Sequence, residues 1–373
     1  MLEAGRDPKT GKRQRETFTV RGTKRDAERE AAERTAAIAR GTYIDPSRET
    51  VGEFLHRWLR DYVDVSISLR SQLRYRDIVE GVLVPHLGGI PIQQLKPAHI
   101  LAIEQELRTA GNRKTGGALA PASVRKVHNV LHRALRHAVA WQVIPLNPAD
   151  AVDRPSVPAA PPKTLNPEQA RVLLGALEGH RFGLALRTAM LCGLRLGELL
   201  ALRWADVDWP NGRLLVVQAL DTRHDGVVRF KETKTHRSAR PVSVPPQLLA
   251  ALREHRVAQE NVRAANSAAW TPLDLVFATD TGLPLTSGWV RKSFYRLLDD
   301  LGLPRIPLHG LRHTMATLML AAGEHPKVVS ERLGHSNPSF TLTVYSHVMP
   351  GMHEDASRRL EESLVAHVKG SPS

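Results

Sequence analysis

Apolar residues in the first half of the chain recur at helical spacing. The segment that starts at Tyr43, "YIDPSRETVGEFLHRWLRDYVDV", repeats them every three or four positions, as one buried helix face requires. These residues are Val51, Phe54, Leu55, Trp58, Leu59 and Tyr62. The same period predicts further helices near residues 68–86, 97–110 and 121–141. We therefore expect an all-helical unit over residues 48–145.

The helix expected over residues 121–141 has two unlike faces. Its apolar side is formed by Val124, Val127, Leu131, Leu135 and Ala138. Its other side carries Arg125, Lys126, His128, His132, Arg133, Arg136 and His137. A face of this kind is either solvated or lies against a polyanion such as DNA. The pattern leaves both interpretations open.

Prolines follow this unit in quick succession. Residues 146–164 combine them with small residues, which is typical of a stiff extended linker. Beyond the linker we expect helices at about 167–178 and 180–192, then strands at roughly 213–220, 227–231 and 239–244, then helices to the end. The predicted fold is mainly α, with a small antiparallel sheet in a second unit over residues 165–362, before a tail over 363–373.

The first 45 residues form a separate basic segment. It predicts a short strand from Arg15 to Arg21, a turn, and a helix from Lys24 to Ala39 with Thr23 as its N-cap. Eight Lys and Arg side chains stand against two acids between residues 6 and 25. Either this is a solvated face, or it is an arm that binds phosphates. The candidate contacts in the arm are Lys12, Arg13 and Arg15.

The composition of the whole chain bears on that choice. Its 373 residues include 52 Lys and Arg against 38 Asp and Glu, which gives a net charge of +14. Such a charge favours a polyanionic partner, and an anionic membrane surface is the alternative. The chain has no 18-residue apolar run and no signal-peptide core. We expect a soluble cytoplasmic protein.

Several kinds of chemistry are excluded by the motifs. Cys192 is the only cysteine, so neither an internal disulfide nor a Cys-based zinc cluster is possible. "GRDPKTGKR" has the wrong glycine spacing for a phosphate-binding P-loop. His309 and His313 are four residues apart, as zinc ligands can be, but no Glu accompanies them. We expect no metal and no cofactor.

Polar residues stand at unusual places in the second unit. Arg195 follows a glycine between two apolar segments, where a guanidinium needs an anion, and Glu198 is its simplest partner. Lys234 is predicted at the tip of a hairpin, His335 on a turn, and Tyr345 ten residues later. Tyr345 is either a half-buried packing residue or a nucleophile.

Taken together, these residues form a cationic set with one tyrosine. Its cations include His309 and Arg312, at the start of an apolar helix. The natural complement of two arginines, a lysine and two histidines is a phosphate whose charge is spread over its oxygens. A tyrosine beside them fits phosphoryl transfer through a covalent intermediate.

The motifs "GLRLGE", "TKTHRSAR", "LHGLRHT" and "LGHSNPSFTLTVYSHV" make the chain resemble the tyrosine recombinase, or phage integrase, family. The family pattern falls on Arg195, Lys234, His309, Arg312, His335 and Tyr345. The resemblance covers about residues 165–360. The helical unit resembles the family's core-binding domain, and residues 1–45 resemble the end of an arm-binding domain. That domain normally opens with strands before the turn, whereas this sequence begins almost at the turn, so we expect a truncated arm or a misassigned start.

The resemblance implies a role for each matched residue. Tyr345 would attack the scissile phosphate and hold the DNA as a 3′-phosphotyrosine. Arg195 and Arg312 would bind the non-bridging oxygens, and His335 would donate a further hydrogen bond. His309 would assist proton transfer from the tyrosine, and Lys234 would protonate the departing 5′ oxygen. Glu198 would orient the site, while His313 and His347 would pack locally.

The resemblance also implies partners. Two DNA-binding units would clamp double-stranded DNA at attachment sites, and four protomers would assemble on two DNA partners, with a directionality factor or a host DNA-bending protein as accessories. The helix expected after Met349 would dock on a neighbouring protomer or pack within its own. The function implied is integration or excision of a phage or other mobile element. The alternatives are a dimer resolvase, a type IB-like topoisomerase and a catalytically silent DNA-binding repressor.

Overall fold

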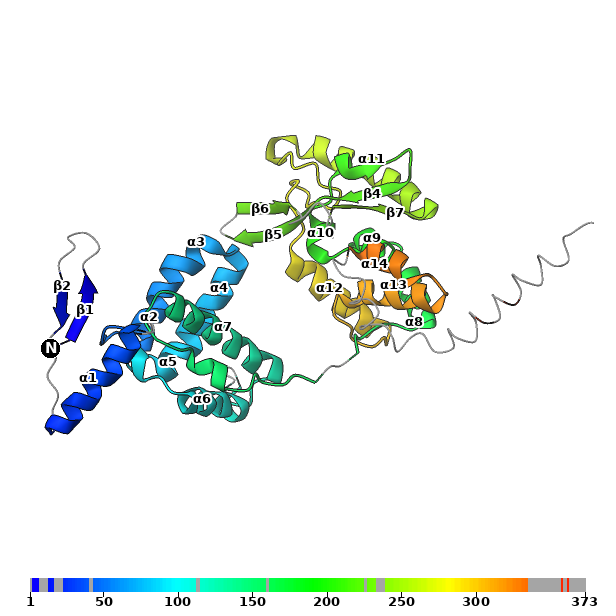
Figure 1. The fold of residues 1–373 in the computed structure, drawn as a ribbon. Helices are drawn as coiled ribbons and strands as arrows, with labels where there is room; N and C mark the ends of the chain where they lie inside the picture. The colour runs from blue at the N-terminus through cyan, green and yellow to red at the C-terminus, as the bar shows by residue number, and fades with distance from the viewer. Residues whose placement is uncertain are drawn as a thin grey trace, which may run out of the picture. The chain divides into compact units, whose positions relative to one another are not determined.

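The computed structural model describes residues 2–6, 13–16, 23–39, 43–111, 115–158, 161–224, 227–232 and 239–334, together with 357 and 361. The chain divides into two compact units between Ala159 and Ala160. This boundary lies inside the predicted linker over residues 146–164. The two units are coloured blue to green and green to orange in Figure 1, and each is described by itself.

A two-stranded sheet precedes the first long helix. β1 (Leu2–Arg6) pairs antiparallel with β2 (Arg13–Glu16), and α1 (Lys24–Ala39) follows. Thr23 caps α1 as predicted, because its Oγ1 accepts from the backbone N–H of Asp26 at 3.3 Å. β1 was not predicted from the sequence, and β2 begins at Arg13, two residues before the strand expected over Arg15–Arg21; residues 17–22 lie outside the described ranges.

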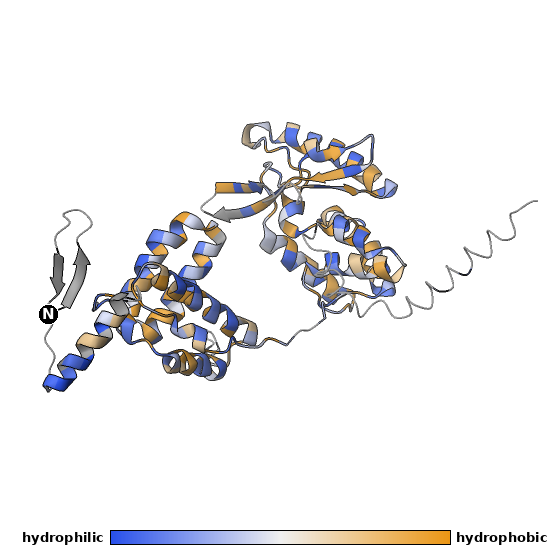
Figure 2. Ribbon diagram, in the orientation of Figure 1, coloured by the Kyte–Doolittle hydropathy of each residue, from blue (hydrophilic) through white to orange (hydrophobic). Residues whose placement is uncertain are grey.

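The rest of the first unit is helical, as predicted. Its helices are α2 (Val51–Trp58), α3 (Asp64–Ser66), α4 (Leu69–Ile78), α5 (Val84–Leu87), α6 (Pro97–Ala110) and α7 (Pro121–Ala140). Short π-helical turns, Leu59–Val63 and Val79–Leu83, join α2 to α3 and α4 to α5. Figure 2 shows apolar and polar residues alternating around these helices. The apolar sides meet in one core around Phe54, Trp58 and Leu131.

One residue of the predicted basic face of α7 lies on the wrong side. His128 is buried, and its Nδ1 lies 2.7 Å from Oε1 of the buried Glu104 on α6. His132 stays nearer the surface, with its Nε2 2.8 Å from a carboxylate oxygen of Asp150. A histidine is compatible with the apolar side of a helix when a carboxylate partners it there. The exposed basic face of α7 is therefore smaller than the sequence suggests.

The second unit packs helices around small antiparallel sheets, which confirms the predicted fold class. Its helices are α8 (Pro167–Ala176), α9 (Gly183–Cys192), α10 (Leu196–Leu200), α11 (Pro246–Ala265), α12 (Ser287–Asp300), α13 (Gly310–Ala321) and α14 (Pro326–Leu333). The core lies around Leu186, Leu214 and Phe294, which are fully buried. None of the described helices is long and apolar enough to cross a membrane.

The strands of this unit pair differently from the prediction. β3 (Val207–Asp208), β4 (Arg213–Val216) and β7 (Arg240–Ser243) form one sheet. β5 (Gln218–His224) and β6 (Val227–Glu232) form another. The single strand expected over 213–220 is therefore two strands in different sheets. The expected hairpin of residues 227–231 with 239–244 was also wrong, because β6 pairs with β5 and β7 with β4.

Candidate active site

Arg195 lies in the sharp turn between α9 and α10. Gly193 caps α9 in the left-handed region, with φ of +63°, and a Cβ on it would lie 2.1 Å from Cε of Met315. Only glycine fits this combination of backbone angle and close packing. Arg195 then starts α10, and its backbone N–H donates to Oε2 of Glu198 at 2.9 Å. Its Nη1 donates to Oε1 of the same carboxylate at 2.6 Å.

The Glu198 carboxylate is shared by two arginines. Arg240 donates from Nη2 to Oε2 at 2.9 Å and from Nη1 to Oε1 at 3.2 Å. Burial raises the pKa of Glu198, but the hydrogen bonds and charges of Arg240 and Arg195 outweigh it and hold the pKa at about 2. The carboxylate is therefore ionised at neutral pH, and its negative charge is divided between the two guanidinium groups.

Arg240 is a residue of this site that the sequence analysis missed. It begins β7, where buried and exposed residues alternate, so Arg240 and Val242 face inward while Pro241 and Ser243 face outward. The sequence signal for its burial was the alternation in "ARPVSV", which places the arginine on the same strand face as the two valines. Its Nε also donates to the backbone carbonyl of Arg332 at 2.8 Å. A buried charge in that register requires fixed partners.

Arg312 comes from the first turn of α13 and is almost wholly buried, with 1% of its surface exposed. Its Nη1 donates to the carbonyl oxygen of Gly193 at 2.6 Å, and its Nη2 donates to that of Leu333. One guanidinium thus joins the turn before Arg195 to the last residue of α14. Three segments that are far apart in the sequence meet at this side chain.

His309 precedes α13 and lies against His313, with the two rings perpendicular and their centroids 4.8 Å apart. Burial lowers the pKa of His309 to about 4, with further contributions from His313, Arg312 and Arg195. Burial also lowers the pKa of His313. His309 is therefore neutral at pH 7.

The structure brings three of the six predicted catalytic residues together: Arg195, His309 and Arg312. Lys234, His335 and Tyr345 lie outside the described residues. The chain is described up to Gly334, directly before His335, and Gly334 takes a left-handed φ of +64°. A Cβ on Gly334 would lie 2.8–3.0 Å from side-chain atoms of Arg240. Gly334, the residue before His335, therefore lies against the Arg240 side chain.

The DNA-binding candidates on α7 fall into two groups. Arg133 donates from Nη1 to the hydroxyl of Tyr75 at 3.1 Å and from Nη2 to that of Tyr62, and it stacks over both rings at 6.0 and 5.3 Å. Lys126 is exposed and Arg125 is half-buried. Arg133 thus has partners within the helical unit. In the arm, Arg13 and Arg15 lie on β2, while Lys12 lies outside the described residues.

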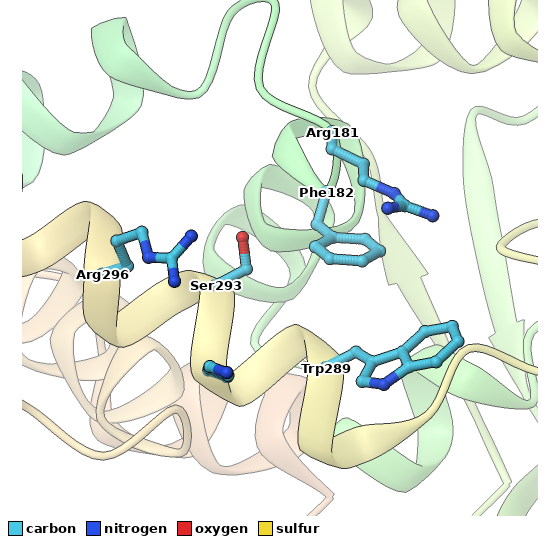
Figure 3. A pocket seen from close by; sticks show the side chains of 6 residues that line it. Arg181, Phe182, Trp289, Ser293 and Arg296 are labelled. Carbon is cyan, nitrogen blue, oxygen red and sulfur yellow. The ribbon is translucent and has the colours of Figure 1, made fainter.

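A basic and aromatic cavity of about 420 Å³ lies elsewhere in the second unit. Arg181 and Phe182 come from the turn before α9, whereas Trp289, Ser293 and Arg296 come from α12 (Figure 3). Its lining residues are distinct from the Arg195, His309 and Arg312 cluster. In the part of the chain that the structure describes, no three His, Cys, Asp or Glu side chains gather as a metal site requires.

Comparison with protein families gives two matches. The phage integrase family matches residues 163–351, and the N-terminal SAM-like domain of phage integrases matches residues 50–107. The first contains the whole candidate cluster. The second covers the α2 to α6 part of the helical unit.

Known proteins and solved structures agree with these matches. A tyrosine recombinase XerC-like protein of Caldanaerobacter subterraneus is 29% identical over 97% of this chain and 95% of its own length. The integrase of Mycobacterium phage D29 is 28% identical over 84% of this chain and 78% of its own length. The Tn1549 transposon integrase, solved with a circular intermediate DNA, superposes with a TM-score of 0.67 at 22% identity, over 84% of this chain and 99% of that one.

A second solved structure is a lambda integrase tetramer bound to a Holliday junction. It superposes with a TM-score of 0.55 at 22% identity, and the match covers 90% of each chain. At these identities the superpositions establish a shared fold, including the succession of a helical unit and a mixed α and β unit.

Proposed function

The chain belongs to the phage integrase family and is a tyrosine recombinase, an enzyme that breaks and rejoins DNA; from this premise we propose that it performs site-specific recombination through a 3′-phosphotyrosine intermediate. Its proposed role is to integrate or excise a phage or another mobile element. Support comes from its relatives, which include the D29 integrase and the ICEBs1 integrase of Bacillus subtilis, 26% identical over 96% of this chain and 95% of its own length.

The observation that carries this proposal is the meeting of Arg195, His309 and Arg312. The Arg312 guanidinium bonds to Gly193, two residues before Arg195, and the charges of both arginines act on His309. Two guanidinium groups beside a neutral histidine suit a phosphodiester that gains negative charge in the transition state. The family motif, read in the same order along the chain, also includes Lys234, His335 and Tyr345. These three residues complete the proposed catalytic set.

In the proposed reaction the Tyr345 oxygen attacks the scissile phosphorus. The bond from phosphorus to the 5′ oxygen breaks, and the tyrosyl phosphodiester keeps its energy for rejoining. Arg195 and Arg312 stabilise the non-bridging oxygens. A phenol normally ionises near pH 10, and His309 is proposed to assist the transfer of its proton.

The remaining proposed roles complete the step. His335 donates a hydrogen bond to a non-bridging oxygen, and Lys234 protonates the departing 5′ oxygen as general acid. Neither role requires a metal ion or a nucleotide cofactor, since the bond energy is conserved in the covalent link.

We further propose that the substrate is double-stranded DNA with attachment sites, and that four protomers act on two DNA partners in the cytoplasm. The lambda integrase tetramer on a Holliday junction supports this assembly, because the fold is shared over most of both chains. A directionality factor and a host DNA-bending protein are proposed accessories. The basic residues Arg125 and Lys126 on α7, together with the arm residues Lys12, Arg13 and Arg15, are proposed phosphate contacts.

A covalent-trapping experiment tests the proposal. A nicked attachment-site substrate loses the fragment needed for rejoining, so cleavage leaves the protein attached to DNA on a denaturing gel. Tyr345→Phe should form no adduct while binding DNA as the unaltered protein does. Tyr295→Phe, which removes the same oxygen from a tyrosine on α12, should form the adduct at the normal rate. An adduct that persists in the Tyr345 variant would contradict the assignment.

A further inference from the structure

Arg240 contacts both sides of the candidate active site. Its two terminal nitrogens bind the Glu198 carboxylate, which holds Arg195, and its Nε binds the Arg332 carbonyl, near the end of α14. The guanidinium is planar and its donors are fixed relative to one another. Because one rigid group bonds on two sides, a shift of either partner disturbs the other.

Two further arginines, Arg312 and Arg332, hold the end of α14 through three hydrogen bonds to backbone carbonyls. Arg312 donates to the Leu333 carbonyl, and the Arg332 side chain donates to the carbonyls of Leu191 at 2.8 Å and Ser243 at 3.0 Å. The last carbonyls of a helix have no partner within the helix itself. Arginines from α13 and β7 supply these partners. In the sequence, His335 follows directly after Gly334, two residues beyond the end of α14.

The charges at Glu198 add a second argument. The carboxylate lies between Arg195 and Arg240, and Arg240 is buried whereas the Arg195 side chain is 42% exposed. Since Arg240 occupies part of the carboxylate, Arg195 directs Nη1 to Glu198 and retains net positive charge on its exposed side. Without Arg240, both carboxylate oxygens would be left to Arg195, which would draw its guanidinium toward Glu198 and away from a phosphate.

We propose that Arg240 is a positioning residue for DNA strand cleavage: it sets the direction of the Arg195 guanidinium through Glu198, and it anchors the chain that leads into His335. This inference rests on the proposed recombinase function. Arg240 has a positioning role because its Nε, Nη1 and Nη2 all donate to protein partners, Glu198 and the Arg332 carbonyl, and it acts through these neighbours.

The test separates positioning from folding and from DNA binding. Single-turnover cleavage of the nicked substrate is measured at increasing protein concentration, which gives a DNA affinity and a rate constant at saturation. Arg240→Gln should lower that rate constant by on the order of 10²-fold, as a misplacement of about 1 Å near reacting atoms does. The DNA affinity should stay within about twofold of normal, since Arg240 is buried and presents little surface to DNA.

Arg240→Lys is a second variant that keeps the positive charge beside Glu198. A lysine has no planar fork and cannot bond to Glu198 and the Arg332 carbonyl in the same geometry. It should therefore fold, retain DNA affinity and still cleave at least tenfold more slowly. It keeps the test valid if Arg240→Gln fails to fold. Arg203→Gln is the matched control, because it breaks another arginine–acid pair of the same unit, and it should cleave at the normal rate.

The double variant Glu198→Gln with Arg240→Gln tests the route. If Arg240 sets Arg195 through Glu198, the double variant should lose less than the product of the two single losses, because either change removes the shared Arg240–Glu198 interaction. The inference is overturned if the Arg240 variants cleave normally, if they lose only DNA affinity, or if the two losses multiply. Failure of the unaltered protein to form a Tyr345-dependent adduct would instead reject the proposed function.

Discussion

Two arginine–acid pairs lie close together in the sequence of the second unit and share one local geometry. In the first, the N–H of Arg195 donates to the carboxylate of Glu198 at 2.9 Å, and in the second the N–H of Arg203 donates to that of Asp206 at 3.3 Å. In each pair the arginine starts a short helix and its guanidinium also binds the acid. The acids are buried and the arginines are partly exposed in both.

The pairs differ in what the acid binds next. Arg203 directs both Nε and Nη2 to Asp206, at 2.9 Å each, and these bonds raise the pKa of Arg203. Glu198 instead receives a second arginine, Arg240, from a distant strand. The same local motif thus forms a two-residue ion pair at Arg203 and Asp206. At Arg195 and Glu198 it is part of a network that includes Arg240. A third residue decides which of the two it becomes.

The largest expected difference between the pairs is in catalysis. Arg195→Ala should lower the single-turnover cleavage rate by roughly 10²–10³-fold, the usual cost of removing one donor to a transition-state charge. Arg195→Lys should recover little of it, because lysine lacks the bidentate fork. Arg203→Ala should leave the rate unchanged. Equal losses in the Arg195 and Arg203 variants would remove the functional distinction between the pairs.

The second difference is in acid stability. The folded pKa of Glu198, about 2, lies below the ordinary 4.5, so its contribution to stability is present above pH 4.5 and is lost as pH falls toward 2. A shift of this size corresponds to about 3 kcal/mol. Unfolding free energies measured by urea from pH 7 down to pH 2 should therefore fall less steeply for Glu198→Gln than for the unaltered protein.

The acid-stability measurement has a matched control in the other pair. Asp206→Asn removes a carboxylate whose arginine is partly exposed, so its effect at pH 7 should be smaller than that of Glu198→Gln, which leaves Arg240 buried without its anion. An unchanged pH dependence in Glu198→Gln would show that this carboxylate is not the group that titrates.

A third comparison tests the space around Arg240. Gly334 and Gly302 both have a φ of +64°, but a Cβ on Gly302 meets nothing within 4 Å, whereas one on Gly334 meets Arg240. Gly302→Ala should cost about 1 kcal/mol of unfolding free energy for its backbone conformation. Gly334→Ala should cost about 1 kcal/mol more, since the guanidinium must move. Equal urea midpoints for the two variants would mean that the Arg240 side chain moves aside without a cost in stability.

The smallest expected effect concerns α7, where one basic side chain is hydrogen-bonded within the unit and two others are exposed or half-exposed. Arg133 is bound to two tyrosine hydroxyls, whereas Lys126 is exposed and Arg125 half-exposed. Changing Arg125 and Lys126 to Ala should flatten the plot of log affinity against log salt by up to about two units, if each contacts one phosphate. Arg133→Ala should mainly lower stability. An unchanged slope in the double variant would make the face a solvated one.

Much of the helical unit was predictable because helices are encoded locally. The apolar period from Val51 to Trp58, together with the Thr50 and Glu53 capping box, identifies α2 from a short window. The bounds of α6 were predicted, and α7 ended one residue early. Burial of His128 was not predictable, because it depends on Glu104 of another helix.

The sheets show the opposite case. The alternation in residues 213–220 and 239–244 indicates strands, but it does not say which strand pairs with which. Leu214 faces Val242, and Leu220 faces Phe230, so the two sheets separate where a single strand was expected. Pairing is decided by the energy of side chains brought together from distant positions.

For the candidate site, the sequence by itself determined the residue types and their order: Arg195, His309 and Arg312 are recognisable from the motifs around them. Only the tertiary structure decided how they are held. The Arg312 bonds to the Gly193 and Leu333 carbonyls, and the sharing of Glu198 between Arg195 and Arg240, join segments far apart in the chain. A motif specifies chemistry within a few residues, whereas the orientation of a buried charge depends on whichever distant groups complete its hydrogen bonds.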